Sequence, residues 1–170
     1  MGFKKMDKSL SFADFALQNS LKHNRSLKNM EKLSQSINWD RINTILLSHY
    51  TVGTASEGAT AYPPLLLYKC LLLQKWFHID SDPELENQIN DRLSFKKFLG
   101  LSFDRPSPDH SAFSRFRSRL SKNAIDQINS EILRQFEAKR LSINEGVAVD
   151  ARLVESASRP LSNDEFHPVK

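Results

Sequence analysis

The sequence predicts a mainly α-helical protein, in which a helical domain is followed by the start of a mixed α/β domain. Three observations predict this. Apolar residues recur at helical spacing through most of residues 25–141, helix-start and helix-end signals flank these segments, and a strand-like apolar run, residues 147–149, comes only after them. Apolar residues make up 39% of the 170 residues and charged residues 26%, which is ordinary for a globular chain.

The first elements begin after a polar stretch. Residues 1–24 are mixed in character, and we expect a loosely ordered arm there. Residues 26–37 form an expected helix, and Asn38 is placed to cap a second helix over residues 39–50. The apolar stripes are Leu27, Met30, Leu33 and Ile37 in the first helix, and Trp39, Ile42, Ile45, Leu46 and His49 in the second.

The middle of the helical domain is expected to hold its most buried helix. Residues 51–62 are small and form a predicted loop, after which Pro63 and Pro64 open a helix at its first turn. That helix is apolar on nearly every side, so we expect it at the centre of a bundle. Its most apolar part, residues 65–77, is too short to span a membrane.

Strong signals mark the next two helices. The run of residues 80–84 combines a capping side chain, a proline and acidic residues, and predicts a helix to about Leu93. A short helix with Phe95 and Phe98 follows, and Gly100 closes it. Residues 101–108 contain two prolines and must form a loop.

Two further helices complete the helical domain, which we place at residues 25–141. Asp109 caps the first of them, and the second turns into the strand through residues 144–146. Residues 146–170 are the expected start of the second domain, which the chain does not complete. The apolar faces consist of Phe113, Phe116 and Leu120 in the first helix, and Ile125, Ile128, Ile132 and Phe136 in the second.

Positive charge is concentrated in one segment. Residues 92–122 carry 8 Lys or Arg against 2 Asp or Glu, and such an excess suits an anionic partner such as DNA. A solvated face of amphipathic helices would have the same composition, and both interpretations stay open. The candidate DNA contacts are Arg92, Lys96, Lys97, Arg115, Arg119 and Lys122.

Arg117 has a different expected role. It follows Phe113 by four residues and therefore flanks the apolar face. We predict a structural arginine that packs beside aromatic rings and pairs with a nearby acid such as Asp109.

Several classes of site and of location are disfavoured. The single cysteine, Cys70, excludes a disulfide framework and a cysteine-based zinc site, and the five histidines have no ligand spacing. The N-terminus lacks the apolar segment of a signal peptide. We expect a cytoplasmic protein without a membrane partner.

A set of motifs in fixed order resembles one known family. The motifs are PP at 63–64, LQKWF at 73–77, SDPELE at 81–86, DRLSFKKFLGL at 91–101, PDHSAFSRFR at 108–117 and VDARLVE at 149–155. Together they resemble bacterial insertion-sequence transposases of the DDE type, in the insertion-sequence-five family. The resemblance covers roughly residues 39–158.

The resemblance implies a chain that binds the ends of its own element for DNA transposition and recombination. Asp150 would lie on the first strand of a ribonuclease-H-like domain, as the first catalytic carboxylate and a ligand of Mg²⁺ in the full-length family protein. The later Asp and Glu of the family are absent from the sequence. One carboxylate cannot hold a two-metal site, so we expect a truncated chain that neither binds Mg²⁺ tightly nor cuts DNA alone.

Two other functions stay open. A DNA-binding regulator could occupy element ends without cutting them, and the same basic segment would serve it. A helical module could instead pair transposase subunits as a homo-oligomer through its apolar helix faces.

Overall fold

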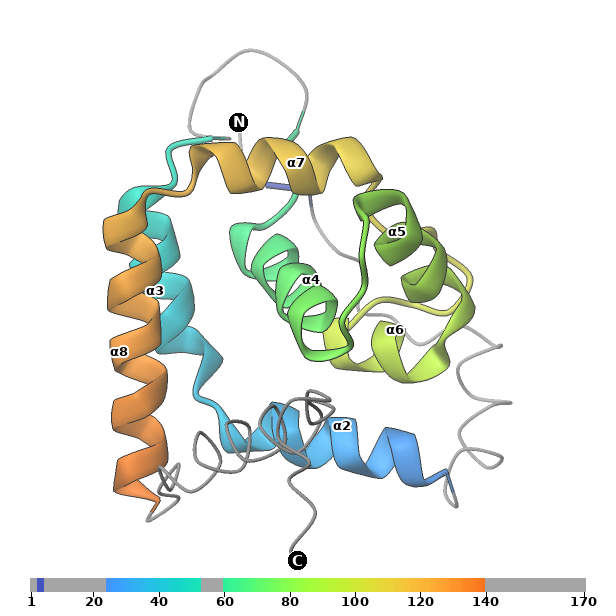
Figure 1. The fold of residues 1–170 in the computed structure, drawn as a ribbon, viewed down its shortest axis with the longest axis horizontal. Coiled ribbons are helices and arrows are strands. Elements are labelled where there is room, and N and C mark those ends of the chain that lie inside the picture. Colours follow the sequence, from blue (N-terminus) through green and yellow to red (C-terminus); the bar gives the residue numbers. More distant parts are fainter. Residues whose placement is uncertain (1–2, 5–23, 53–59, 140–170) are drawn as a thin grey trace, which may run out of the picture. The chain divides into compact units, whose positions relative to one another are not determined.

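The computed structural model describes residues 3–4, 24–52 and 60–139, and these residues form helices and no strand (Figure 1). The mainly α prediction is confirmed for them, whereas the predicted strand and Asp150 lie outside the described residues. The chain divides into two compact units, Met1–Gln135 and Phe136–Lys170, and the contacts described below lie within the first. The helices are α2 (Arg25–Ser36), α3 (Trp39–His49), α4 (Pro64–Trp76), α5 (Asp82–Asp91), α6 (Leu93–Leu99), α7 (His110–Arg119) and α8 (Lys122–Ala138).

Helix α4 is the central element. It contacts α3, α5, α6 and α7, which surround it in Figure 1. Leu73 and Cys70 are fully buried, and burial raises the pKa of the Cys70 thiol and moves the pKa of Tyr68 to about 12. The prediction that this helix is central is therefore confirmed. No helix in the described ranges is long and apolar enough to cross a membrane.

Side-chain caps begin the helices where the sequence predicts them. The Asn38 side-chain oxygen accepts hydrogen bonds from the backbone N–H groups of Asp40 and Arg41, at 3.2 and 3.4 Å. Asp109 accepts one from the Ala112 N–H at 2.9 Å, and Ser81 accepts one from the Glu84 N–H at 3.3 Å. Each cap satisfies a donor that would otherwise lack a partner in the first helical turn.

The boundary between α5 and α6 differs slightly from the prediction. Helix α5 ends at Asp91 rather than near Leu93, because Arg92 adopts an extended conformation with φ −96° and ψ 111°. Leu93 already belongs to α6, and Gly100 ends that helix in the left-handed region with φ 70°, as predicted.

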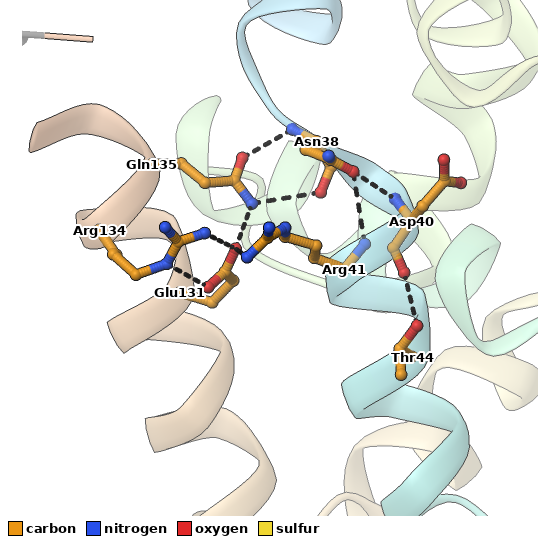
Figure 2. Close-up of polar contacts among 7 residues, drawn as sticks. All are labelled: Asn38, Asp40, Arg41, Thr44, Glu131, Arg134 and Gln135. Atoms are coloured by element: carbon orange, nitrogen blue, oxygen red, sulfur yellow. Dashed lines mark hydrogen bonds and ion pairs between the residues drawn. The ribbon is translucent and has the colours of Figure 1, made fainter. Parts of the chain in front are cut away.

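Polar side chains join α8 to the start of α3 (Figure 2). Gln135 is 6% exposed, accepts a hydrogen bond from the Asn38 N–H at 2.6 Å and donates one to the Asn38 carbonyl at 3.2 Å. Glu131 accepts hydrogen bonds from Arg134 and Gln135 and lies 3.8 Å from Arg41. These partners, Arg134 first, lower the Glu131 pKa to about 2. The α2–α3 connection is therefore tied to a helix about a hundred residues later in the chain.

Candidate nucleic-acid interface

The basic segment separates into two groups in the structure. The junction group, Arg92, Lys96 and Lys97, lies at the α5–α6 boundary and on α6, which packs against α2. The corner group, Arg115, Arg119 and Lys122, lies on α7 and at the start of α8. Figure 1 shows α6 beside α2, whereas the C-terminal end of α7 meets α8. One stretch of sequence therefore supplies two separate surfaces.

Lys96 lies inside the protein. It is 5% exposed, and its ammonium donates hydrogen bonds to the backbone carbonyls of Phe103 and Arg105, both at 2.9 Å. These bonds connect α6 to the proline-containing loop before α7, whose carbonyls lack helical partners. A phosphate cannot reach this ammonium, so we leave Lys96 out of the proposed interface. The sequence alone cannot show this, because the periodicity of a seven-residue helix defines its buried face poorly.

The other two members of the junction group are exposed. The Lys97 ammonium lies 3.7 Å from a carboxylate oxygen of Glu31 on α2. The Arg92 guanidinium lies over the rings of Phe95 and Phe77, with its carbon 5.0 and 5.9 Å from their centroids. Both side chains remain open to solvent on one side.

The corner group contains the most available cations. Arg115 is 59% exposed at its side chain and lies 3.7 Å from Asp109, a separation that makes a weak ion pair. Arg119 and Lys122 are also exposed, and neither has an ion pair or a side-chain hydrogen bond within the described part of the chain. Only two residues, Leu120 and Ser121, separate them across the turn between α7 and α8.

Arg117 pairs with an acid, but the acid is Asp82 rather than Asp109. The Arg117 guanidinium donates to both carboxylate oxygens of Asp82, at 2.7 and 3.3 Å, and to the side-chain oxygen of Gln74 at 3.0 Å. These contacts join α7 to α5 and α4, and the hydrogen bonds from Arg117 are the main cause of the lowered Asp82 pKa.

Asp109 has other partners. Its carboxylate accepts hydrogen bonds from the Ser111 hydroxyl and the Ala112 N–H, which lower its pKa. The predicted ion pair between Arg117 and Asp109 is therefore wrong, and Arg117 pairs with Asp82 instead. Asp82 lies 35 residues before Arg117, and only the packing of α5 against α7 brings the two together.

Helix α2 carries cations that the sequence interpretation did not include. Arg25, Lys28 and Lys32 are exposed on it, and α2 is the main packing partner of α6. The sequence did indicate a positively charged N-terminal region, because residues 1–41 carry 8 Lys or Arg against 4 Asp or Glu. The exposed cations of α2 and α6 therefore come together from segments about 65 residues apart.

The structure does not test the predicted catalytic residue. Asp150 lies outside the described residues, so its roles as first carboxylate and metal ligand stay predictions. Within residues 3–4, 24–52 and 60–139, no group of three His, Cys, Asp or Glu side chains could hold a metal ion.

A family model described as "Transposase domain (DUF772)" matches residues 15–119, which is more than half of the chain. The match includes the junction group and α7 and ends at Arg119. No solved structure matches the chain.

Proposed function

Because the chain belongs to the transposase domain family DUF772, we propose that its function in transposition is to bind the DNA ends of a mobile element through the helical domain. The family match supports a transposition-related function. Binding to element ends, the DDE type and membership of the insertion-sequence-five group are our proposals. They rest on the motif order described above.

The observation that carries the DNA-binding proposal is the exposure of the corner group. Arg119 ends α7, Lys122 begins α8, and no acidic side chain among the described residues neutralises either one. Helix α7 itself is held firmly, because Arg117 joins it to α4 and α5. A rigid helix end with unpaired cations suits contacts to the phosphate backbone of duplex DNA, which position a protein without reading the sequence.

Titration of an element-end duplex tests this proposal. The double variant Arg119→Ala/Lys122→Ala should weaken binding on the order of tenfold, and the slope of log K against log salt should fall by about 2, since about one counterion is released per phosphate contact. Fluorescence anisotropy at several salt concentrations measures both quantities.

A matched control removes the same amount of charge elsewhere. Lys28→Ala/Lys32→Ala takes two exposed cations from α2, which packs against α6. If this control weakens duplex binding as much as the corner variant does, the binding is not localised at the corner group and the assignment fails.

We also propose that Asp150 is the first carboxylate of a DDE triad and that it would be a ligand of Mg²⁺. The support is the motif VDARLVE at 149–155, which resembles the first catalytic strand of the family. Carboxylate oxygens are the ligands that Mg²⁺ prefers, and the metal supplies charge stabilisation for phosphoryl transfer when it is bound. Asp150→Ala should leave duplex binding unchanged. Metal-dependent nicking of an element end that is lost in Asp150→Ala would support this assignment, and nicking that survives the substitution would contradict it.

A further inference from the structure

A cavity of about 480 Å³ lies where α2, the end of α4 and the start of α6 meet. Its lining residues include Phe77, Phe95, Arg92, Asn24 and Asn29. The volume is within the range of small-molecule sites. The lining combines aromatic, cationic and amide residues, a combination that the corner group does not provide.

Phe77 is unusually exposed for a large aromatic side chain. It is 42% exposed and contacts Phe95 with the ring centroids 4.7 Å apart. The backbone after it is strained, because His78 has φ 50°, in the left-handed region where helix ends usually carry glycine. The Ile79 N–H closes this turn on the Gln74 carbonyl at 2.9 Å. The turn therefore holds the backbone beside Phe77 in a conformation that a non-glycine residue rarely adopts.

Arg92 supplies a cation beside this aromatic surface. Its guanidinium lies over Phe95 and Phe77, and no acidic side chain in the described part of the chain pairs with it. A ligand for this cavity should therefore be anionic at one end and flat at the other.

An unpaired nucleotide has this chemistry. Its base presents a π-face that stacks on aromatic rings, its phosphate pairs with arginine, and its base edge offers donors and acceptors to amides such as that of Asn29. A base inside a duplex cannot stack on Phe77, because both of its faces are already covered by neighbouring base pairs.

We propose that this cavity binds one unpaired nucleotide of DNA, with its base against Phe77 and its phosphate on Arg92. The proposal rests on the proposed DNA-binding function and extends it, because it separates two contacts. The corner group would hold duplex DNA, and the cavity would hold a nucleotide outside the duplex, such as one at a frayed or cut end.

Two DNA molecules that differ in one feature test this. One is a blunt element-end duplex, and the other is the same duplex with a short single-stranded 3′ extension that carries a fluorescent base analogue. The wild-type chain should bind the extended duplex more tightly and change the fluorescence of the analogue. Phe77→Leu should weaken binding of the extended duplex on the order of tenfold and leave blunt-duplex binding unchanged, because leucine keeps apolar volume but cannot stack.

Matched variants show whether a loss of binding comes from lost stacking or lost local charge rather than from unfolding of the protein. Phe77→Tyr should retain the preference for the extension, because tyrosine keeps the ring. Arg92→Gln should reduce the preference, whereas Lys97→Gln removes the same charge from a side chain that does not line the cavity and should not reduce it. Circular dichroism establishes that each variant is folded, and Arg92→Gln keeps the test decisive if Phe77→Leu unfolds.

The experiment distinguishes failure of the cavity proposal from failure of the proposed DNA-binding function. If the extension adds no affinity, or if Phe77→Leu and Arg92→Gln bind it as the wild type does, the cavity proposal is overturned. Blunt-duplex binding that still depends on Arg119 and Lys122 would then leave the proposed function standing. If the chain binds neither DNA, the proposed function fails and the cavity proposal fails with it.

Discussion

Lys96 on α6 and Arg119 at the end of α7 each carry one positive charge within the same basic segment, yet their surroundings differ. Lys96 is 5% exposed and bonded to two carbonyl oxygens, whereas Arg119 is exposed and has no ion-pair partner within the described residues. The difference follows from what each helix adjoins. Helix α6 adjoins the loop whose Phe103 and Arg105 carbonyls accept hydrogen bonds from Lys96, whereas Arg119 lies exposed at the C-terminal end of α7.

The same contrast exists within α7. Arg117 makes a two-pronged pair with Asp82 at 2.7 and 3.3 Å, while Arg115, two residues earlier, is 3.7 Å from Asp109. Only Arg117 faces α5 and α4. Charge in a sequence therefore indicates a DNA interface only after the charges with internal partners are removed.

The largest expected effect comes from Lys96→Met. The variant keeps the apolar stem but leaves the Phe103 and Arg105 carbonyls without the ammonium, so we expect a loss of about 2 kcal/mol in the free energy of unfolding. Urea denaturation measures it. Lys97→Met should change this free energy by less than about 0.5 kcal/mol, because its ion pair with Glu31 is exposed. If Lys96→Met and Lys97→Met lowered the free energy of unfolding equally, the buried lysine would contribute no more to stability than the exposed one.

Arg117→Met should have the next largest effect. It breaks the pair with Asp82 and the hydrogen bond to Gln74, and we expect a loss of about 1 kcal/mol, because the arginine is about half exposed. The thermal unfolding midpoint should fall in parallel. An unchanged midpoint would show that the contacts of Arg117 add nothing to stability.

The contribution of this pair should depend on pH. Arg117 holds the Asp82 pKa below its usual value, so Asp82 is ionised and stabilising above the unfolded-state pKa of about 3.9. As the pH falls below that value and through the lower folded-state pKa, the stabilisation is lost. The stability difference between wild type and Arg117→Met should be constant from about pH 7 to 5 and shrink below about pH 4. A difference that persists at lower pH would assign the effect to packing.

The smallest expected effects on stability belong to the corner group. Arg115→Ala and Arg119→Ala should each change the free energy of unfolding by less than about 0.5 kcal/mol, because an exposed side chain with a distant partner or none contributes little. Urea denaturation beside the Lys96→Met variant measures this. A loss as large as that of Lys96→Met would place these arginines among the structural cations.

Much of the fold could be predicted because its signals are local. Asn38 and Asp109 cap the helices that follow them, Gly100 ends α6, and the apolar residues after Pro64 identify α4 as central. Each prediction depends on residues within a few positions of one another. The turn at His78 was not predicted. A left-handed residue at a helix end is usually recognised in the sequence by a glycine, and here the residue is a histidine.

The partners of the charged and amide side chains depended on long-range packing. Gln135 bonds to Asn38 and Arg117 to Asp82, and neither pair is marked by any spacing along the chain. The cavity beside Phe77 is assembled from α2, α4 and α6, so no single segment predicts it.

The sequence by itself determined the helices, their order, the central helix and the basic character of residues 92–122, because hydrophobic periodicity, capping and charge are properties of neighbouring residues. The tertiary structure alone decided which cations have internal partners and which remain available to a phosphate. Contacts between residues far apart in the chain form only when helices pack, and packing depends on the shapes of whole helix faces rather than on local spacing.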